Sequence, residues 1–270
     1  MRENKTRTSR ANRKTGRRHP LATVGLLAIG LLFTGGGYAA LSTSTANAQT
    51  DPSSQQTIAE GQKLFAANCA TCHGLSAEGA DGGPSLIGVG AASVDFQVGT
   101  GRMPMQRQAA QALEKPVQFT DEDIAAMAAY VASLAPGPAI PEGEVLDAKG
   151  NASVGAELFR INCAMCHNVA GAGGALTEGK FAPSLKGVSE KHIYEAMVTG
   201  PQNMPVINDM NVSPEGKRDI ITYLKYIETK GNPGGYELGN FGPVPEGLFI
   251  WIFGIGGVVA LTVWITARSN

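Results

Sequence analysis

The four cysteines of this 270-residue chain all lie in two copies of one short motif, Cys-x-x-Cys-His. The copies consist of Cys69, Cys72 and His73, and of Cys163, Cys166 and His167. Two intervening residues on one helical turn place both sulfurs under the two vinyl groups of a haem, and the next residue presents an imidazole to the iron. The spacing therefore predicts two covalently bound c-type haems, with His73 and His167 as ligands of the haem irons.

Zinc is the competing interpretation, because two Cys-x-x-Cys pairs can form one four-thiolate site. Three features favour haem. A histidine follows each pair, the pairs begin far apart at residues 69 and 163, and each pair has its own methionine downstream. No cysteine is left over for a disulfide or a free nucleophile.

The second axial ligand of each iron is predicted to be a methionine. An electron carrier needs a neutral ligand that stays in place through the redox change, and methionine opposite histidine does this while raising the potential. Met103 and Met204 occupy matching positions in the two halves, each before a proline. Proline disfavours helix in the residue before it, so the sulfur can be held over the haem. Met105 is the alternative in the first half.

The segments around the motifs repeat each other. Residues 61–73 match residues 155–167 at Gly, Leu, Phe, Asn, Cys, Ala, Cys and His. Pro-Ser-Leu and Met-Pro then recur in the same order, and each half closes on a helical pattern, at residues 120–134 and 214–229. In these closing patterns, Asp123, Ile124 and Tyr130 of the first half correspond to Asp219, Ile220 and Tyr226 of the second. The chain is therefore predicted to hold two copies of one small, mainly helical domain. His192 has no counterpart in the first copy, and we expect it to have a surface or core role.

An apolar segment at residues 21–41 precedes the repeats. It follows a leader in which residues 1–20 hold eight of the 22 Lys and Arg, and this positive flank predicts that the segment starts in the cytoplasm. Its length favours a retained membrane anchor. The glycines at 35–37 and the Ala-x-Ala pattern at 46–48 favour a cleaved secretory signal, and both interpretations stay open.

A second apolar segment, residues 248–267, follows the repeats without one charge. At roughly 20 residues it is long enough to cross the hydrocarbon core as a helix. Arg268 comes directly after it, which predicts a cytoplasmic C-terminus and haem domains on the extracytoplasmic side of the cell membrane. The chain after the leader is acidic and has no basic patch, so a nucleic-acid partner is not expected.

These patterns divide the chain into six predicted segments. They are a basic leader with signal peptide or anchor (1–50), a first domain (51–135), a Pro-rich linker (136–152), a second domain (153–230), a Gly/Pro-rich linker (231–247) and a transmembrane helix (248–267).

The order of the motifs in each copy resembles the class I cytochrome c fold over residues 57–134 and 153–229. The resemblance implies an all-α protein with two tandem class I cytochrome c domains plus a C-terminal transmembrane helix. It also implies that a glycine and a phenylalanine pack against the tyrosine-bearing helix of each copy. These are Gly61 and Phe65 with the helix of Tyr130, and Gly155 and Phe159 with the helix of Tyr226.

The resemblance further implies that the carbonyl groups of Pro84 and Pro183 accept the proton of the haem-ligating imidazole. In the second copy Ala182 replaces the glycine before the proline, and the loop after His167 is five residues longer. The local geometry of that loop is therefore expected to differ from the first copy.

The whole arrangement resembles the dihaem cytochrome c subunit of the actinobacterial cytochrome bcc complex, a menaquinol:cytochrome c reductase. This resemblance implies a subunit of a quinol–cytochrome c reductase that carries electrons and has no catalytic residue or substrate pocket of its own. Its implied partners are cytochrome b, the Rieske iron–sulfur protein as electron donor, and a haem–copper terminal oxidase as acceptor.

The alternative is the dihaem subunit of a haem–copper oxidase, or another membrane-anchored dihaem carrier. Oxidase subunits of this kind usually have N-terminal anchors, so the segment at 248–267 favours the reductase. A dihaem peroxidase or thiosulfate dehydrogenase needs an open coordination position or a reactive ligand such as cysteine. With Met103 and Met204 available and no spare cysteine, neither requirement is met.

Overall fold

The structure is a computed structural model that describes residues 20–46, 54–230, 238 and 243–268. It divides into two compact units, Met1–Thr50 and Asp51–Asn270. The predicted leader up to residue 19, most of the Ala-x-Ala pattern and most of the linker at 231–247 lie outside the described residues. The limits of the six segments proposed above stay predictions.

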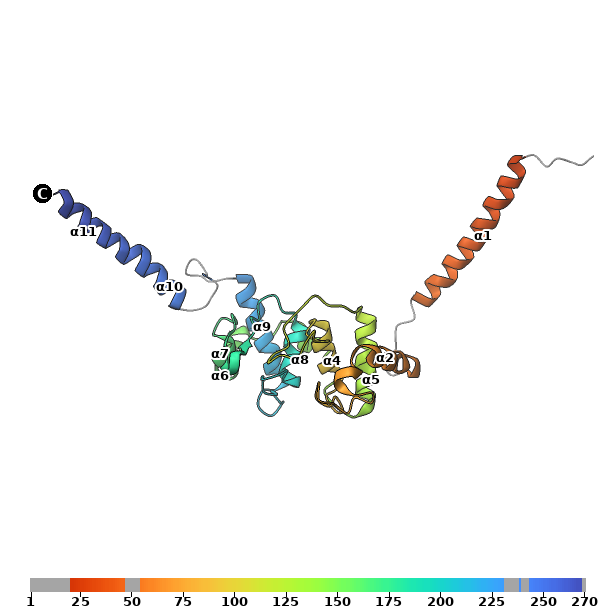
Figure 1. The fold of residues 1–270 in the computed structure, drawn as a ribbon, viewed down its shortest axis with the longest axis horizontal. Coiled ribbons are helices and arrows are strands. Elements are labelled where there is room, and N and C mark those ends of the chain that lie inside the picture. The colour runs from red at the N-terminus through yellow and green to blue at the C-terminus, as the bar shows by residue number, and fades with distance from the viewer. Residues whose placement is uncertain (1–19, 47–53, 231–237, 239–242, 269–270) are drawn as a thin grey trace, which may run out of the picture. The chain divides into compact units, whose positions relative to one another are not determined.

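The first repeat folds into four helices, α2 (Gln55–Asn68), α3 (Ala70–His73), α4 (Ala91–Gly99) and α5 (Asp121–Leu134) (Figure 1). Ser54 caps α2 by accepting a hydrogen bond from the Thr57 amide, and Thr120 forms a capping box with Asp123 at the start of α5. Helices α2 and α5 pack against each other and enclose the core. The buried side chains of this core include Phe65, Ile124, Met127, Tyr130 and Val131.

The second repeat has the same order of helices, α6 (Ala152–Asn162), α7 (Ala164–His167), α8 (Glu190–Thr199) and α9 (Pro214–Lys230). Its core includes Phe159, Ile193, Met197, Ile220, Ile221 and Leu224. Helices α6 and α9 pack as α2 and α5 do. The predicted repeat of one mainly helical domain is confirmed.

A small hairpin distinguishes the second domain from the first. Strand β1 (Gly174–Ala175) pairs antiparallel with β2 (Phe181–Ala182), and a 3-10 turn, η2 (Thr177–Gly179), connects them. The hairpin lies in the loop after the second haem motif, where the sequence carries five extra residues. The all-α prediction is correct for the framework, and this hairpin is a local addition to it.

In each domain, the first and last helices cross at a glycine. A Cβ atom on Gly61 would lie 1.9 Å from the carbonyl oxygen of Ala126, and a Cβ atom on Gly155 would lie 1.9 Å from that of Asp219. Only glycine permits so close an approach of two backbones. Next to each crossing a phenylalanine packs on a tyrosine, as the resemblance implied for these helices.

The tyrosine of the second domain differs from the predicted one. Phe65 packs on Tyr130 with ring centroids 5.3 Å apart, and Phe159 packs on Tyr223, 5.5 Å away. Tyr226 is 54% exposed. The predicted match of Tyr130 to Tyr226 is therefore wrong by three residues, which is close to one helical turn and so preserves most of the apolar pattern.

The corrected register places Lys217 where the first domain has Ile124. Both side chains are buried, Lys217 completely. The ammonium group of Lys217 donates to the carbonyl oxygen of Val212 at 2.9 Å and forms an ion pair with Asp209. A buried lysine needs such partners, and these two residues belong to the loop that follows Met204.

The Pro-rich linker between the domains is not helical throughout. It contains one short 3-10 helix, η1 (Gly143–Leu146). Directly after it, Asp147 accepts two hydrogen bonds of 2.8 Å from the guanidinium group of Arg218 on α9. The linker is thereby attached to the second domain.

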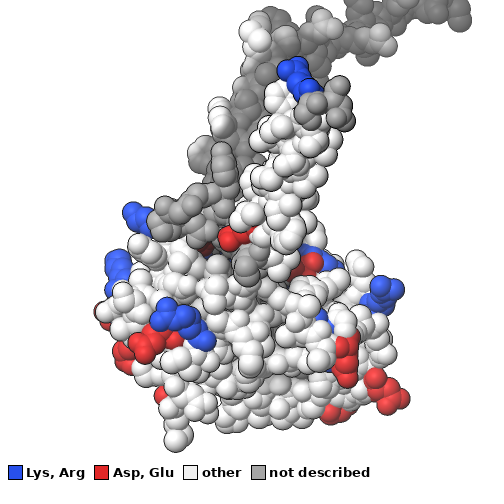
Figure 2. All heavy atoms as spheres, turned by 90° about the vertical axis from the view of Figure 1, so that its left-hand side faces the viewer, with Lys and Arg blue, Asp and Glu red and all other residues white. Residues whose placement is uncertain are grey.

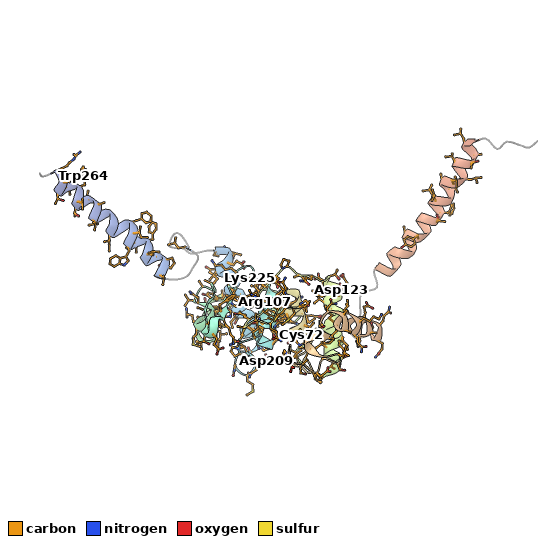
Figure 3. The ribbon with its side chains drawn as sticks, in the orientation of Figure 1. Cys72, Arg107, Asp123, Asp209, Lys225 and Trp264 are labelled. Carbon is orange, nitrogen blue, oxygen red and sulfur yellow. The ribbon has the colours of Figure 1, made fainter. Side chains whose placement is uncertain are left out.

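Among the residues that the structure describes, two helical segments are long and apolar enough to cross a membrane. Helix α1 (Pro20–Ala46) contains the first predicted segment. Helix α10 (Pro243–Phe249), a π-helical stretch (Ile250–Ile255) and α11 (Gly256–Arg268) together contain the second. Near the end of α11, the guanidinium carbon of Arg268 lies 4.8 Å from the centre of the Trp264 ring (Figure 3). The predicted C-terminal helix is confirmed, and the choice between signal and anchor for residues 21–41 stays open.

Candidate haem-binding sites

Each Cys-x-x-Cys-His motif forms a single helical turn directly after the first helix of its domain. The amides of Cys69 and Cys163 donate to Phe65 and Phe159 at 2.8 Å, which ends the preceding helix. The histidine amide then donates back to the first cysteine of its own motif, at 3.0 Å in the first copy and 2.9 Å in the second. The turn that the spacing predicted is present in both domains.

A proline carbonyl group determines the tautomer of each motif histidine. Nδ1 of His73 lies 2.8 Å from the carbonyl oxygen of Pro84, and Nδ1 of His167 lies 3.0 Å from that of Pro183. A carbonyl oxygen can only accept, so Nδ1 donates and the lone pair stays on Nε2. Both histidines therefore present a free Nε2, and the implied role of the two prolines is confirmed.

The surroundings of His167 also favour the neutral imidazole. Burial lowers its pKa, and the hydrogen bond to Pro183 opposes that shift. Neutral imidazole is the form that binds a metal. In the first domain, the loop before Pro84 lies close to the motif histidine. A Cβ atom on Gly83 would stand 2.9 Å from Cε1 of His73.

The four cysteines lie in two separate pairs and form no disulfide bond. Burial, with a smaller effect of the neighbouring thiol, raises the pKa of Cys69 and of Cys163 to about 11. Within the described part of the chain, the one group of His, Cys, Asp and Glu donors close enough to share a metal ion contains no cysteine. The four-thiolate zinc site is therefore excluded, and the separate pairs fit thioether attachment.

The predicted methionine ligands lie in equivalent surroundings. Met103 packs against the core of the first domain together with Cys69, and Met204 packs against that of the second together with Cys163. Met105 instead lines a cavity of about 470 Å³ beside Pro84. Met127 and Met197 are buried in the two cores. Of the remaining described methionines, Met165 and Met210 are 93% and 96% exposed.

The thiol pairs, the free Nε2 atoms and the core-packed methionines together fit one haem in each domain. Bound c-type haem would be held by Cys69 and Cys72 in the first domain and by Cys163 and Cys166 in the second. The exposed thiol of Cys72 is labelled among the side chains of the first domain in Figure 3.

The two domains contact each other beside the second site. The side-chain amide of Gln111 donates to the carbonyl oxygen of Phe181 at 2.8 Å and accepts from its amide at 2.9 Å. Gln202 makes the same pair of hydrogen bonds with Ala112, at 3.0 and 3.1 Å. Phe181 and Gln202 each lie two residues before a residue predicted at the second haem, Pro183 or Met204. The loop after Met103 in the first domain is thus attached to both sides of the second site.

Helices α4 and α8 form the other part of this interface (Figure 1). His192 on α8 meets Phe96 on α4 edge-on, with ring centroids 6.0 Å apart. His192 therefore lies between the domains, a position that the sequence alone did not predict. The only available signal was that the histidine has no counterpart in the first copy.

On the face that Figure 2 shows, the described charged side chains do not gather into one patch. Figure 2 shows acidic and basic side chains in small separate groups on the face turned toward the viewer. This face offers no continuous basic surface of the kind that binds a phosphate backbone.

Comparison with known proteins places these sites in a family. The cytochrome c family matches residues 58–135, and the family described as cytochrome C oxidase, cbb3-type, subunit III matches residues 150–224. The chain is 45% identical to the cytochrome bc1 complex cytochrome c subunit of Mycobacterium tuberculosis, covering 98% of this chain and 96% of the relative. The corresponding subunit of Corynebacterium diphtheriae is 42% identical, with 98% of both chains covered. The chain belongs to the family of cytochrome bc1 complex cytochrome c subunits.

Membership of the cytochrome bc1 complex cytochrome c subunit family confirms the cofactor, because both domains match cytochrome c families and carry complete attachment motifs. The subunit thus has two domains for covalent c-type haem and acts in electron transport. It is a membrane-anchored protein with a C-terminal helix that could span the membrane. The oxidase alternative accounts for less of the chain. The CcoP subunit of the cbb3-type oxidase of Rubrivivax gelatinosus is 34% identical over 44% of this chain and 36% of that relative.

Proposed function

We propose that this subunit relays electrons from the Rieske iron–sulfur protein to a haem–copper terminal oxidase, beside cytochrome b in a quinol–cytochrome c reductase of the cytochrome bcc type. The observation that supports a relay is that one chain holds two haem-binding sites in domains that contact each other. A second covalent haem in the same chain replaces a diffusing carrier, because the next acceptor stays attached.

The axial ligands proposed are His73 and Met103 for the first iron, and His167 and Met204 for the second. Bound c-type haem supplies a one-electron carrier. The Pro84 and Pro183 carbonyl groups keep each imidazole oriented, which limits movement of the ligands during electron transfer. Filling both axial positions also leaves no coordination position for a substrate, so the chain transfers electrons without catalysing a reaction itself.

The proposed location follows from the two apolar helices. The basic leader before α1 favours a cytoplasmic start, and Arg268 after α11 favours a cytoplasmic C-terminus. Both haem domains then lie on the extracytoplasmic side of the cell membrane, where c-type haem would meet its partners.

The test is to purify the tagged chain from its native membrane in mild detergent. Co-purifying subunits are identified by mass spectrometry, and the reduced-minus-oxidised spectrum is recorded. Cytochrome b, Rieske and oxidase subunits together with c-type haem support the proposal. Oxidase subunits without cytochrome b and Rieske protein would support the oxidase alternative, favoured by the family matched at residues 150–224. A dihaem chain without partners would refute the assigned complex.

A further inference from the structure

Three metal-binding side chains meet where the two haem domains contact each other. Asp95 comes from α4 of the first domain, and His192 and Glu195 come from α8 of the second. Nε2 of His192 lies 3.9 Å from a carboxylate oxygen of Asp95 and 4.0 Å from one of Glu195. One donor atom from each residue lies within 4.8 Å of the other two. None of the three is a proposed haem ligand.

Glu195 is the residue that needs a partner. Its side chain is 0% exposed, and neither oxygen of the ionised carboxylate meets a hydrogen-bond donor among the described residues. The neighbouring polar group is the carboxyl group of Asp95. A buried carboxyl group without hydrogen bonds is costly, and such groups in native proteins call for an explanation. Burial, then the neighbouring Asp95, raises the pKa of Glu195 to about 9. The nearby charge of Lys191 opposes this rise only in part.

We propose that Asp95, His192 and Glu195 bind one divalent transition-metal ion, zinc by its chemistry, and that this ion links the two haem domains. One imidazole nitrogen and two carboxylate oxygens form a donor set that suits zinc, and a fourth position stays open to water. Calcium and magnesium prefer oxygen donors only. The ion would neutralise both carboxylates at once.

The distances require only a small adjustment. Zinc bonds of about 2.1 Å place neighbouring tetrahedral donors roughly 3.4 Å apart. The separations of His192 Nε2 from the two carboxylates are 3.9 and 4.0 Å, and side-chain rotation can shorten both to that value. The backbone of α4 leaves space for the imidazole, because a Cβ atom on Gly99 would lie 3.2 Å from Nε2.

Lys191 is the competing cation at this site. Its ammonium nitrogen lies 2.6 Å from the carboxylate of Asp95. The ion pair leaves Glu195 without a partner, and the Lys191 side chain is 41% exposed on a flexible stem. A bound ion would displace Lys191 toward solvent. Removing the lysine should therefore strengthen metal binding, whereas a purely structural ion pair predicts no such gain.

The test uses the full-length protein with both haems, without a polyhistidine tag, in detergent and freed of metals other than iron by a chelator. Equilibrium dialysis against zinc, followed by elemental analysis, should find one zinc ion for every two haem irons. Asp95→Asn, His192→Gln and Glu195→Gln each remove a proposed ligand and should weaken binding by at least the roughly 10- to 100-fold that loss of an outer-shell partner costs. Lys191→Ala should tighten binding several-fold. Glu190→Gln, on the same helix but outside the cluster, is the control and should bind as the wild type does.

The first-domain variant decides whether the ion bridges the domains. Zinc binding that survives Asp95→Asn, or a wild-type holoprotein that binds no zinc, would overturn the proposal. If a variant fails to fold, the wild type still provides a test by hydrogen exchange. Zinc should slow exchange in both α4 and α8 while leaving α2 unchanged, and equal exchange with and without zinc would contradict a bridging ion.

Discussion

Gly155 lies against Asp219 so closely that a Cβ atom would stand 1.9 Å from the Asp219 carbonyl oxygen. The same contact between Gly61 and Ala126 in the first domain shows that this crossing of the first and last helices sets the frame of each haem domain. The first helix leads directly into the haem motif, so displacing it displaces the cysteines.

Replacing this glycine should destabilise the second domain. In Gly155→Ala the new methyl group meets backbone, which cannot rotate away, and overpacking of this kind costs about 1–3 kcal/mol. The midpoint of thermal unfolding of the holoprotein should fall, and covalent haem in the second domain should decrease. Glu157→Ala, on the exposed side of the same helix, serves as control. An unchanged midpoint in Gly155→Ala would contradict the observed helix contact.

The paired glutamine contacts should control how firmly the two domains are attached. Gln202→Ala removes two hydrogen bonds between the domains, worth about 1 kcal/mol each. The amide of Ala112 then loses its acceptor, so its hydrogen exchange should accelerate roughly 5- to 30-fold. If the two glutamine contacts form cooperatively, hydrogen exchange of the Phe181 amide should accelerate as well.

A matched control exists within the first domain. The side-chain amide of Gln108 donates to Asp81 in its own domain, 3.3 Å away. Gln108→Ala should therefore leave exchange at Ala112 and Phe181 unchanged. Equal exchange in Gln202→Ala and Gln108→Ala would mean that the glutamine contacts do not hold the domains together.

The attachment of the linker should depend on pH. Hydrogen bonds from Arg218, followed by a smaller effect of the Lys149 amide, lower the pKa of Asp147. A lowered carboxyl pKa stabilises the fold above the unfolded-state value of about 4, and this stabilisation is lost as the pH falls through the lower folded-state value. The difference in unfolding midpoint between wild type and Asp147→Asn should be largest near neutral pH and vanish in acid. A difference that stayed constant with pH would argue against the ion pair as its cause.

The two candidate methionines of the first domain can be separated by spectroscopy. Met103→Leu should remove the far-red absorption band of one iron–methionine bond, about half of the total for two equivalent haems. The potential of that haem should also fall, because methionine ligation raises it. Met105→Leu should leave both properties unchanged, since Met105 does not pack against the core with Cys69 as Met103 does. Loss of the band in Met105→Leu but not in Met103→Leu would identify Met105 as the ligand of the first haem.

Much of each haem site could be predicted from sequence because its determinants are local. Two cysteines and a histidine on one helical turn carry the attachment chemistry, whatever the rest of the fold does. The helices that support the motif carry apolar residues at helical spacing, and their limits agree with the predicted patterns at 120–134 and 214–229 to within a residue.

The errors and omissions concern contacts between distant residues. The tyrosine of α9 was misassigned because a shift of three residues nearly preserves the apolar face, and only the contact of Phe159 with Tyr223 distinguishes the registers. The cluster of Asp95, His192 and Glu195 depends on which surfaces of the two domains meet. No local pattern encodes that choice. Comparing the two repeats does not reveal an interface residue that occurs in one copy alone.

A spectroelectrochemical titration of the purified full-length chain would count its haems and show how each iron is coordinated. We predict two one-electron steps, each with the spectrum of a six-coordinate c-type haem, and a far-red methionine band that disappears as both irons are reduced. Fewer than two electrons per chain would contradict a dihaem relay. A five-coordinate spectrum from either haem would contradict the proposed pairs His73 with Met103 and His167 with Met204.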